Sequence, residues 1–227
     1  LGTSKNPLLE MVRVLWLVYV LLRNRKFDRV FVFHWSLILD LILRIALGNR
    51  IYSVNNKTEF DLSRHRVMRN LDLLKKAYPD LQYEMEDLQL EFFPSPFEAI
   101  RVEKPYIVIA PGGGKNVWSE MKNRRWPVED YIQLAEKVNS HLGLNVVFVG
   151  GPDECFPLPD EEKLRNLVGK TTFDQLAGLL KQAELFIGSD SFAPFLAAAA
   201  GCRTLGIFGP TNSNLINPFG KDHVAIQ

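Results

Sequence analysis

The chain has 227 residues, of which 47% are hydrophobic and 23% charged, a globular composition that excludes disordered, collagen-like and solenoid classes. The net charge of +1 combines a basic stretch over residues 1–76 (14 Lys and Arg against 6 Asp and Glu, +8), an acidic one over 77–105 (2 against 7, −5) and a nearly neutral one over 106–227 (11 against 13, −2). No basic run is interleaved with aromatic residues, so we expect no nucleic-acid partner. Cys155 and Cys202 offer neither zinc-binding spacing nor a disulfide framework, which favours a reducing, cytoplasmic compartment.

The segment Leu8–Leu22 is very apolar, although Glu10 and Arg13 interrupt it. Its uninterrupted part, Val14–Leu22, has 9 residues, well below the ~20 that a membrane-spanning helix needs. Basic residues follow the segment rather than precede it, which argues against a signal peptide. A buried or half-buried helix is the favoured interpretation, followed by a helix that also lies on a membrane surface with its basic tail against anionic lipid; a true membrane span is the least favoured.

The N-terminal part alternates strands and helices. The pattern predicts strands over Phe27–Phe33 and Arg50–Val54 and helices over Leu37–Leu47 and Arg64–Tyr78. Residues 79–105 are acidic and rich in proline, which is typical of a connector. At about 150 residues per domain the length allows two small domains, and we expect one over residues 1–98 and the other over 99–227.

From residue 106 the alternation becomes regular, with short loops. The expected strands are Tyr106–Ala110, Asn145–Val149, Glu184–Ile187 and Thr204–Phe208. The expected helices are Val128–Leu142, one that begins at Thr172 with Gln175 as its capping-box partner, and Ser191–Ala200. This order predicts an α/β fold with a doubly wound parallel sheet covered by helices on both faces. Such sheets bind ligands at the carboxyl ends of their strands.

A glycine-rich run, Gly112-Gly113-Gly114-Lys115, comes shortly after the expected strand Tyr106–Ala110. The run lacks the glycine spacing of a Walker loop and the Ser or Thr after its lysine. Two interpretations remain: a turn whose backbone amides approach an anion, and a plain tight turn.

Two further motifs suit an anionic ligand. Arg124 and Arg125 precede a helix and could hold a diphosphate through planar guanidinium groups; taken alone, the pair fits solvated surface charge better. Asp190 and Ser191 lie between a strand and a helix start, where free N–H groups attract anions and where either side chain could also cap the helix.

Together and in this order, the motifs resemble glycosyltransferase family 9, the lipopolysaccharide heptosyltransferases. The matching stretches are APGGG at Ala110–Gly114, RRWPVEDYIQLAEKV at Arg124–Val138, VVFVGGPDE at Val146–Glu154, LVGKTTFDQLAGLLKQAELFIGSDS at Leu167–Ser191 and GIFGPTNSNLINPFG at Gly206–Gly220. The resemblance implies a GT-B fold, in which two Rossmann-like domains face a cleft. Compared with the family pattern, we expect the chain to be truncated at both ends and its first domain to be incomplete.

By this resemblance the chain is expected to be a glycosyltransferase that moves a heptose from an ADP-sugar to a lipid-linked saccharide such as the lipopolysaccharide core, with inversion. Arg124 would stabilise the leaving group, Glu154 would accept hydrogen bonds from the ribose and Thr171 would lie near the base. The expected donor-binding residues are Gly112, Gly113, Gly114, Arg124, Glu154, Thr171, Asp190, Ser191, Phe192 and Ala193. We expect no cofactor and no metal, and a cytoplasmic location with peripheral contact at the inner face of the membrane.

Some positions depart from the family pattern. Phe192 stands where the family has glycine, Phe195 where it has histidine and Arg124 where it has lysine. The glycine-rich turn that carries the family's proposed catalytic aspartate lies upstream of the sequence given, so no general base is assigned, and His34 is expected to be structural or to line the acceptor site. Two alternatives stay open: another GT-B enzyme such as a sugar-nucleotide epimerase, and a non-catalytic relative with a degenerate donor site.

Overall fold

The computed structural model describes residues 12, 16, 19–20, 22, 27–33, 37–54, 61, 63–85, 88, 91–92, 100–113, 121–154, 156 and 164–227. The chain divides into two compact units, Leu1–Gln82 and Tyr83–Gln227, each of which is described by itself. His34 lies outside the described residues, as do Gly114 and Lys115 of the glycine turn.

The first unit contains a short parallel pair of strands, β1 (Val30–Val32) and β2 (Ile51–Ser53), joined through helix α2 (Leu37–Leu47), and then helix α3 (Arg66–Ala77). A small core joins Val32 of β1, Leu43 and Leu47 of α2, and Ile51 of β2, and Leu22 packs against it. The carboxyl end of the apolar N-terminal segment is thus half-buried, whereas Val12 and Trp16 are exposed. Among the described residues, no helix is long and apolar enough to cross a membrane.

The strand β1 is shorter than the predicted Phe27–Phe33. Arg29 explains the difference, because its guanidinium donates to the carbonyl of Ala77 and lies 4.1 Å from the centroid of the Tyr78 ring. Arg29 therefore contacts the end of α3, while the carbonyl of Phe27 accepts a hydrogen bond from Arg50, just before β2. The α3 helix and the α2 helix agree with their predicted positions to within two residues.

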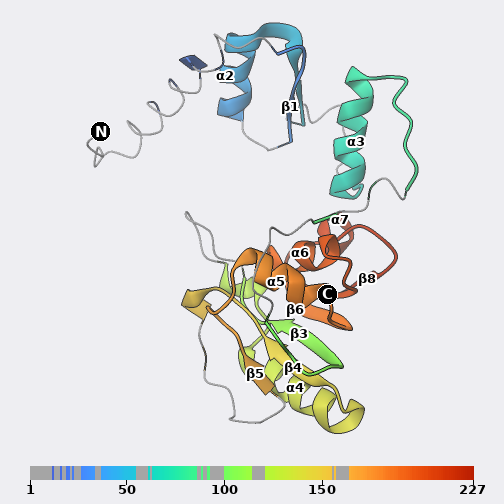
Figure 1. Ribbon diagram of the computed structural model, residues 1–227. Coiled ribbons are helices and arrows are strands. Elements are labelled where there is room, and N and C mark those ends of the chain that lie inside the picture. The colour runs from blue at the N-terminus through green and yellow to red at the C-terminus, as the bar shows by residue number, and fades with distance from the viewer. Residues whose placement is uncertain are drawn as a thin grey trace. The chain divides into compact units, whose positions relative to one another are not determined.

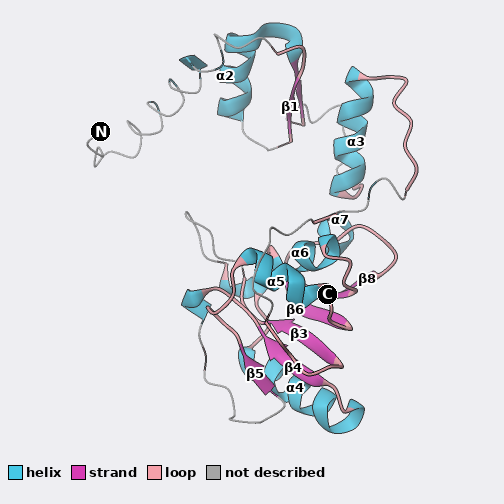
Figure 2. Cartoon of the chain, viewed as in Figure 1, coloured by secondary structure: helices cyan, strands magenta, loops and turns pink. Residues whose placement is uncertain are grey.

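The second unit contains a six-stranded parallel sheet (Figure 2). Its strands are β3 (Tyr106–Ala110), β4 (Asn145–Phe148), β5 (Leu164–Asn166), β6 (Leu185–Ser189), β7 (Thr204–Ile207) and β8 (His223–Ile226). Their order across the sheet is β5-β4-β3-β6-β7-β8. Numbered along the unit this is 3-2-1-4-5-6, the arrangement of a Rossmann fold, in which the chain direction across the sheet reverses between β3 and β6.

Helices cover both faces of this sheet (Figure 1). Because side chains alternate along a strand, β3 sends Val108 to one face and Ile107 to the other, and all five of its residues are buried. Helices α5 (Phe173–Leu180) and α6 (Ala193–Ala199) pack on the Val108 face, and α4 (Val128–Leu142) packs on the Ile107 face. The predicted capping box is confirmed, since Thr172 and Gln175 exchange hydrogen bonds at the start of α5.

The connector belongs with the second unit. The amide of Phe92 donates to the carbonyl of Ala199 at 2.8 Å, and Phe92, Ile100 and Val102 pack against the core beneath α5 and α6. The division of the chain therefore lies between Gln82 and Tyr83, whereas the sequence placed it between residues 98 and 99.

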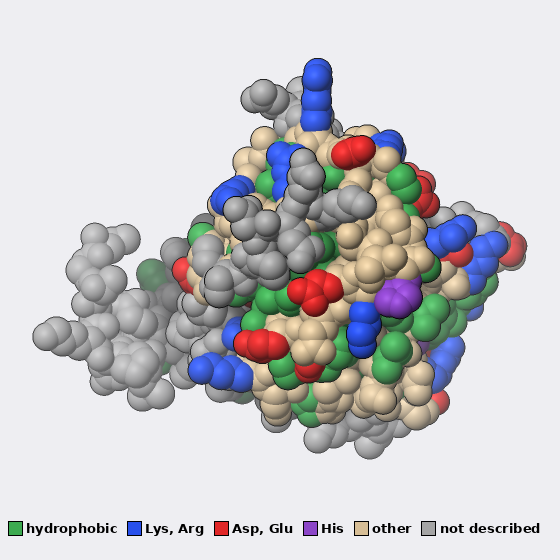
Figure 3. Space-filling view, turned by 90° about the horizontal axis from the view of Figure 1, so that it is seen from below, with side chains coloured by type: hydrophobic (Ala, Val, Ile, Leu, Met, Phe, Trp, Pro, Cys, Tyr) green, Lys and Arg blue, Asp and Glu red, His purple; other side chains and the backbone are tan. Residues whose placement is uncertain are grey.

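Among the strands and α-helices of the described residues, β5, β8 and the one-turn helix α7 (Ser213–Ile216) had no counterpart in the sequence analysis. Charged side chains of both signs are interspersed on the face drawn in Figure 3.

Candidate functional site

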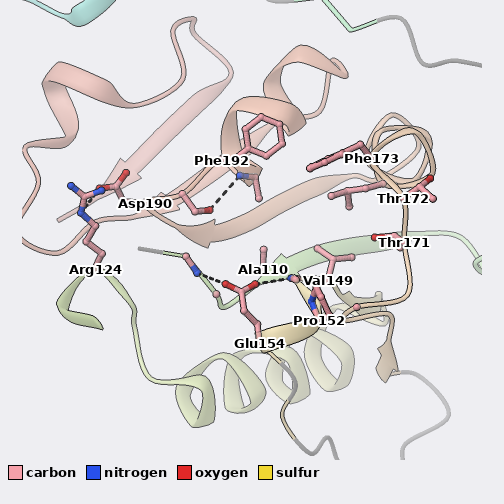
Figure 4. A pocket seen from close by; sticks show the side chains of 18 of the residues that line it. Ala110, Arg124, Val149, Pro152, Glu154, Thr171, Thr172, Phe173, Asp190 and Phe192 are labelled. Atoms are coloured by element: carbon pink, nitrogen blue, oxygen red, sulfur yellow. Dashed lines mark hydrogen bonds and ion pairs between the residues drawn. The ribbon is translucent and has the colours of Figure 1, made fainter. Parts of the chain in front are cut away.

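The principal cavity of the second unit lies where the strand order reverses. β3 ends at Ala110 and leads into the glycine turn, while its neighbour β6 ends at Ser189 and leads into Asp190. Residues after both strands line a cavity of about 800 Å³ (Figure 4). Open parallel sheets bind ligands at this kind of switch point, and the volume suits a drug-sized ligand.

The structure brings together the residues that the sequence placed at the donor site. Nine of the ten line this cavity: Gly112, Gly113, Arg124, Glu154, Thr171, Asp190, Ser191, Phe192 and Ala193. The tenth, Gly114, lies outside the described residues. Other lining residues were not singled out: Met121, Val149, Gly150, Gly151, Pro152, Gly169, Thr172, Phe173 and Leu176. Gly150 and Gly151 could have been predicted as site residues from the sequence, because they directly follow the predicted strand Asn145–Val149 and so lie at the carboxyl ends of the strands.

A single carboxylate joins the two glycine loops. Glu154 accepts a hydrogen bond from the amide of Gly113 on one oxygen and from the amide of Gly151 on the other, each at 2.8 Å. A Cβ at Gly112 would lie 2.1 Å from the Glu154 carboxyl carbon, so only glycine lets the carboxylate reach this position. The amide of Gly113 therefore donates its hydrogen bond to Glu154 in this structure. The turn was expected to bind an anion through its backbone amides, and this amide is not available for that role.

Other side chains bind the backbone carbonyls of the same turn. Arg125 donates through Nε to the carbonyl of Gly113 at 2.5 Å, and the buried Ser189 hydroxyl donates to the carbonyl of Pro111 at 3.3 Å. The hydroxyl of Tyr131 on α4 lies 3.0 Å from Ser189 Oγ, and burial raises the pKa of Tyr131 to about 12, which keeps that hydroxyl protonated. The described part of the turn, Pro111–Gly113, is thus held by Glu154, Arg125 and Ser189, which lie in three separate parts of the chain.

The two adjacent arginines have different positions. Trp126 packs edge-to-face on Tyr131 with ring centroids 4.9 Å apart, which anchors the chain at the start of α4. Arg124 then lines the cavity, whereas Arg125 lines a shallower depression and binds the glycine turn. The interpretation of Arg125 as solvated surface charge is therefore wrong, because it overlooked this backbone contact.

Arg124 lies beside Asp190 at one end of the cavity. Its Nε is 3.5 Å from Asp190 Oδ2; the Arg124 side chain is 30% exposed and that of Asp190 6%. Neither atom makes a hydrogen bond within the described part of the chain. The loop that carries Arg124 packs directly against the backbone of Gly209, which follows β7. A Cβ at Gly209 would lie 2.5 Å from the carbonyl oxygen of Asn123, so this close packing requires glycine.

The helix after Asp190 begins later than predicted. α6 starts at Ala193 rather than at Ser191 and has 7 residues. Ser191 Oγ accepts a hydrogen bond from the amide of Ala193 at 3.3 Å, so Ser191 rather than Asp190 contacts the start of the helix. Because α6 is short, we assign the positive charge at this end of the cavity to Arg124 and not to a helix dipole.

Phe192 and Phe195, the two phenylalanines that depart from the family pattern, have different surroundings. Phe192 lines the cavity and meets Phe173 edge-to-face, with ring centroids 5.6 Å apart and an interplanar angle of 83°. Phe195 is half-buried and is not among the lining residues of this cavity. Among the described residues, no group of three or more His, Cys, Asp or Glu side chains is arranged to hold a metal ion.

Comparison with known proteins gives the family. The family model described as glycosyltransferase family 9 (heptosyltransferase) matches residues 43–227. The chain belongs to glycosyltransferase family 9. It is 24% identical over 212 residues to lipooligosaccharide heptosyltransferase 2 of Campylobacter jejuni, and 26% identical over 171 residues to lipopolysaccharide heptosyltransferase 3 of Escherichia coli K12. These matches cover 88% and 70% of this chain but 63% and 48% of the relatives, so the family 9 chain spans about half to two-thirds of their length.

Solved structures confirm the fold of this family 9 chain. It aligns with the E. coli ADP-heptose lipopolysaccharide heptosyltransferase II at a TM-score of 0.62 and 20% identity, over 95% of this chain and 73% of that one. It aligns with a family 9 glycosyltransferase of Veillonella parvula at a TM-score of 0.63 and 16% identity, over 100% and 69%. The predicted α/β class and GT-B type are therefore confirmed.

The carboxylate bridge generates a prediction about stability. We expect Glu154→Gln to lower the free energy of unfolding by about 1–3 kcal/mol, because the amide can accept only one of the two backbone N–H groups and turns a donor toward the other. Chemical denaturation measures the change. The control is Glu136→Gln on the exposed side of α4, expected to stay within about 0.5 kcal/mol of the unsubstituted chain. Equal stability of the Glu154 and Glu136 variants would show that the bridge does not hold the loops.

Proposed function

We propose that this family 9 chain belongs to a glycosyltransferase that moves a sugar from an ADP-linked donor, by resemblance a heptose, to a lipid-linked saccharide of the lipopolysaccharide core type. The supporting comparisons are the family itself and two relatives named as heptosyltransferases. The observation that carries the proposal is that the guanidinium of Arg124 and the Gly113 turn, which Glu154 holds, line one cavity at the switch point of the sheet.

The proposed reaction is an inverting displacement at the anomeric carbon. The oxygen of the acceptor hydroxyl forms the new C–O bond, the bond from the anomeric carbon to the diphosphate oxygen breaks, and the hydroxyl proton passes to a general base. Negative charge grows on the departing diphosphate during this step. Arg124 stabilises that charge from a fixed position, which is the effect that accelerates such reactions.

Two other lining residues fit the nucleoside part of the donor. Both oxygens of Glu154 keep a lone pair beyond the bonds from Gly113 and Gly151, and these can accept hydrogen bonds from ribose hydroxyls. Thr171 lies beside Thr172 in the cavity lining and is proposed to face the base.

Arg124 provides the test of the reaction. We expect Arg124→Ala to lower turnover of ADP-heptose more than it weakens ADP binding, because the leaving-group charge is greatest in the transition state. The loss of one charge-assisted contact corresponds to about 10- to 150-fold. Steady-state kinetics and calorimetry with ADP measure the two effects. Arg124→Lys should recover much of the activity, since it keeps the charge.

The Arg124 test needs an arginine control whose side chain does not contribute to the site. Arg125 is unsuitable, because its contact with Gly113 means that Arg125→Ala should lower both stability and activity. Arg203 is the better control. It is exposed and directly precedes β7, so it lies at the amino ends of the strands, away from the cavity at their carboxyl ends. If Arg124→Ala behaves like Arg203→Ala, Arg124 does not stabilise the leaving group. If ADP binds but no sugar is transferred, product analysis separates an epimerase from a non-catalytic relative.

Donor binding is expected to need no divalent metal, because the guanidinium of Arg124 can supply the positive charge that the diphosphate requires. Calorimetric titration of ADP with and without an excess of chelator measures this. Equal affinities are the expected result. A large loss of affinity on chelation would instead indicate that a metal ion bridges the diphosphate to the protein.

The first unit is proposed to contact the membrane that holds the acceptor. Residues 1–76 carry a net charge of +8, and Val12, Trp16, Leu41 and Ile45 are each more than half exposed. Trp16 and Ile45 line one apolar groove. Binding to vesicles of anionic phosphatidylglycerol should therefore fall steeply with salt, because exposed charges are screened over about 10 Å at 0.1 M ionic strength. Trp16→Ala should weaken it. Equal binding to neutral phosphatidylcholine vesicles would remove the electrostatic part of the proposal.

A further inference from the structure

Two phenyl rings at the cavity stand where helix chemistry favours other residues. Phe173 is the first residue of α5 and directly follows its cap Thr172, while Phe192 is the N-cap of α6 and makes no side-chain capping bond. Small polar residues are preferred at the N-cap. Phe173 is 67% exposed and Phe192 58%. Neither capping nor core packing therefore accounts for these rings.

The two rings come from different helices and meet at the cavity. Their edge-to-face contact presents an exposed aromatic surface beside Thr171 and Thr172. In Figure 4, Arg124 and Asp190 lie toward one end of the lining and Phe173 toward the other, with Phe192 between them. The cavity therefore has one charged end and one aromatic end. A ligand that fits both must carry an anionic group at one end and a flat apolar group at the other.

We propose that Phe173 and Phe192 bind the nucleobase of the donor by stacking. This inference rests on the proposed function, since the diphosphate held by Arg124 directs the base to the aromatic end. Stacking of a base on an aromatic side chain contributes about 5- to 150-fold to affinity and tolerates every base, because each has a flat π face. The two rings should therefore make the site bind a nucleoside diphosphate more tightly than a diphosphate without a base. Purines should bind more tightly than pyrimidines, because they stack over a larger area.

Calorimetry on the full chain tests the pair with two probes, ADP and inorganic pyrophosphate, the second measured by displacement of ADP. Phe173→Ala and Phe192→Ala are each expected to weaken ADP binding by about 5- to 150-fold and to leave pyrophosphate binding unchanged. Phe173→Leu and Phe192→Leu keep an apolar side chain without a flat ring, and they should also weaken ADP binding. Phe192→Tyr keeps the ring and should bind ADP as the unsubstituted chain does.

The controls separate this proposal from the proposed function. Leu142→Ala removes an exposed apolar side chain at the end of α4 and should change neither probe. Arg124→Ala should weaken both probes. If the two Phe→Ala variants bind ADP normally while Arg124→Ala does not, the stacking proposal is wrong and the proposed function stands. If a Phe→Ala variant loses both probes equally, the rings support the fold instead and stacking is overturned. If the unsubstituted chain binds neither ADP nor UDP, both proposals fail.

Discussion

The geometry of the cavity depends on one carboxylate. Glu154 accepts from the amides of Gly113 and Gly151, and these amides belong to loops that follow two neighbouring strands of the sheet. Glycine chains are flexible in isolation, and without the bridge each loop would have several accessible conformations. With it, the floor of the cavity is fixed before any ligand arrives, so little of the binding free energy is spent on ordering it.

The glycines and the polar side chains around this bridge act as one assembly. Gly112 leaves room for Glu154, and Arg125 holds the carbonyl of the residue whose amide Glu154 binds. Tyr131 and Ser189 extend the contacts to α4 and β6. The positions that tolerate least change therefore surround the cavity floor, while Arg124 and the two phenyl rings at its ends are held by fewer contacts.

The sequence predicted the features that depend on local chemistry. The five-residue buried run of β3, the periodic face of α4 and the capping box at Thr172 are all specified by residues close together in the chain. The strand β5 was missed because it has three residues, one of them charged, and becomes a strand only by pairing with β4. The Glu154 bridge joins residues 41 positions apart, and the Phe173–Phe192 contact joins two helices. No local pattern encodes such contacts. The sequence named three of these four residues, Gly113, Glu154 and Phe192, without showing which of them touch, and it did not name Phe173.

The pairing of Arg124 with Asp190 determines which anions the empty cavity attracts. A guanidinium and a carboxylate 3.5 Å apart nearly cancel each other's field at a distance, so the cavity gains little long-range pull on small anions such as free phosphate, which are abundant in any cell. A ligand has to come close enough to compete with Asp190 for the guanidinium, and each further contact that it makes in the cavity strengthens its binding. The carboxylate thus makes the site discriminate by the number of simultaneous contacts instead of by charge alone.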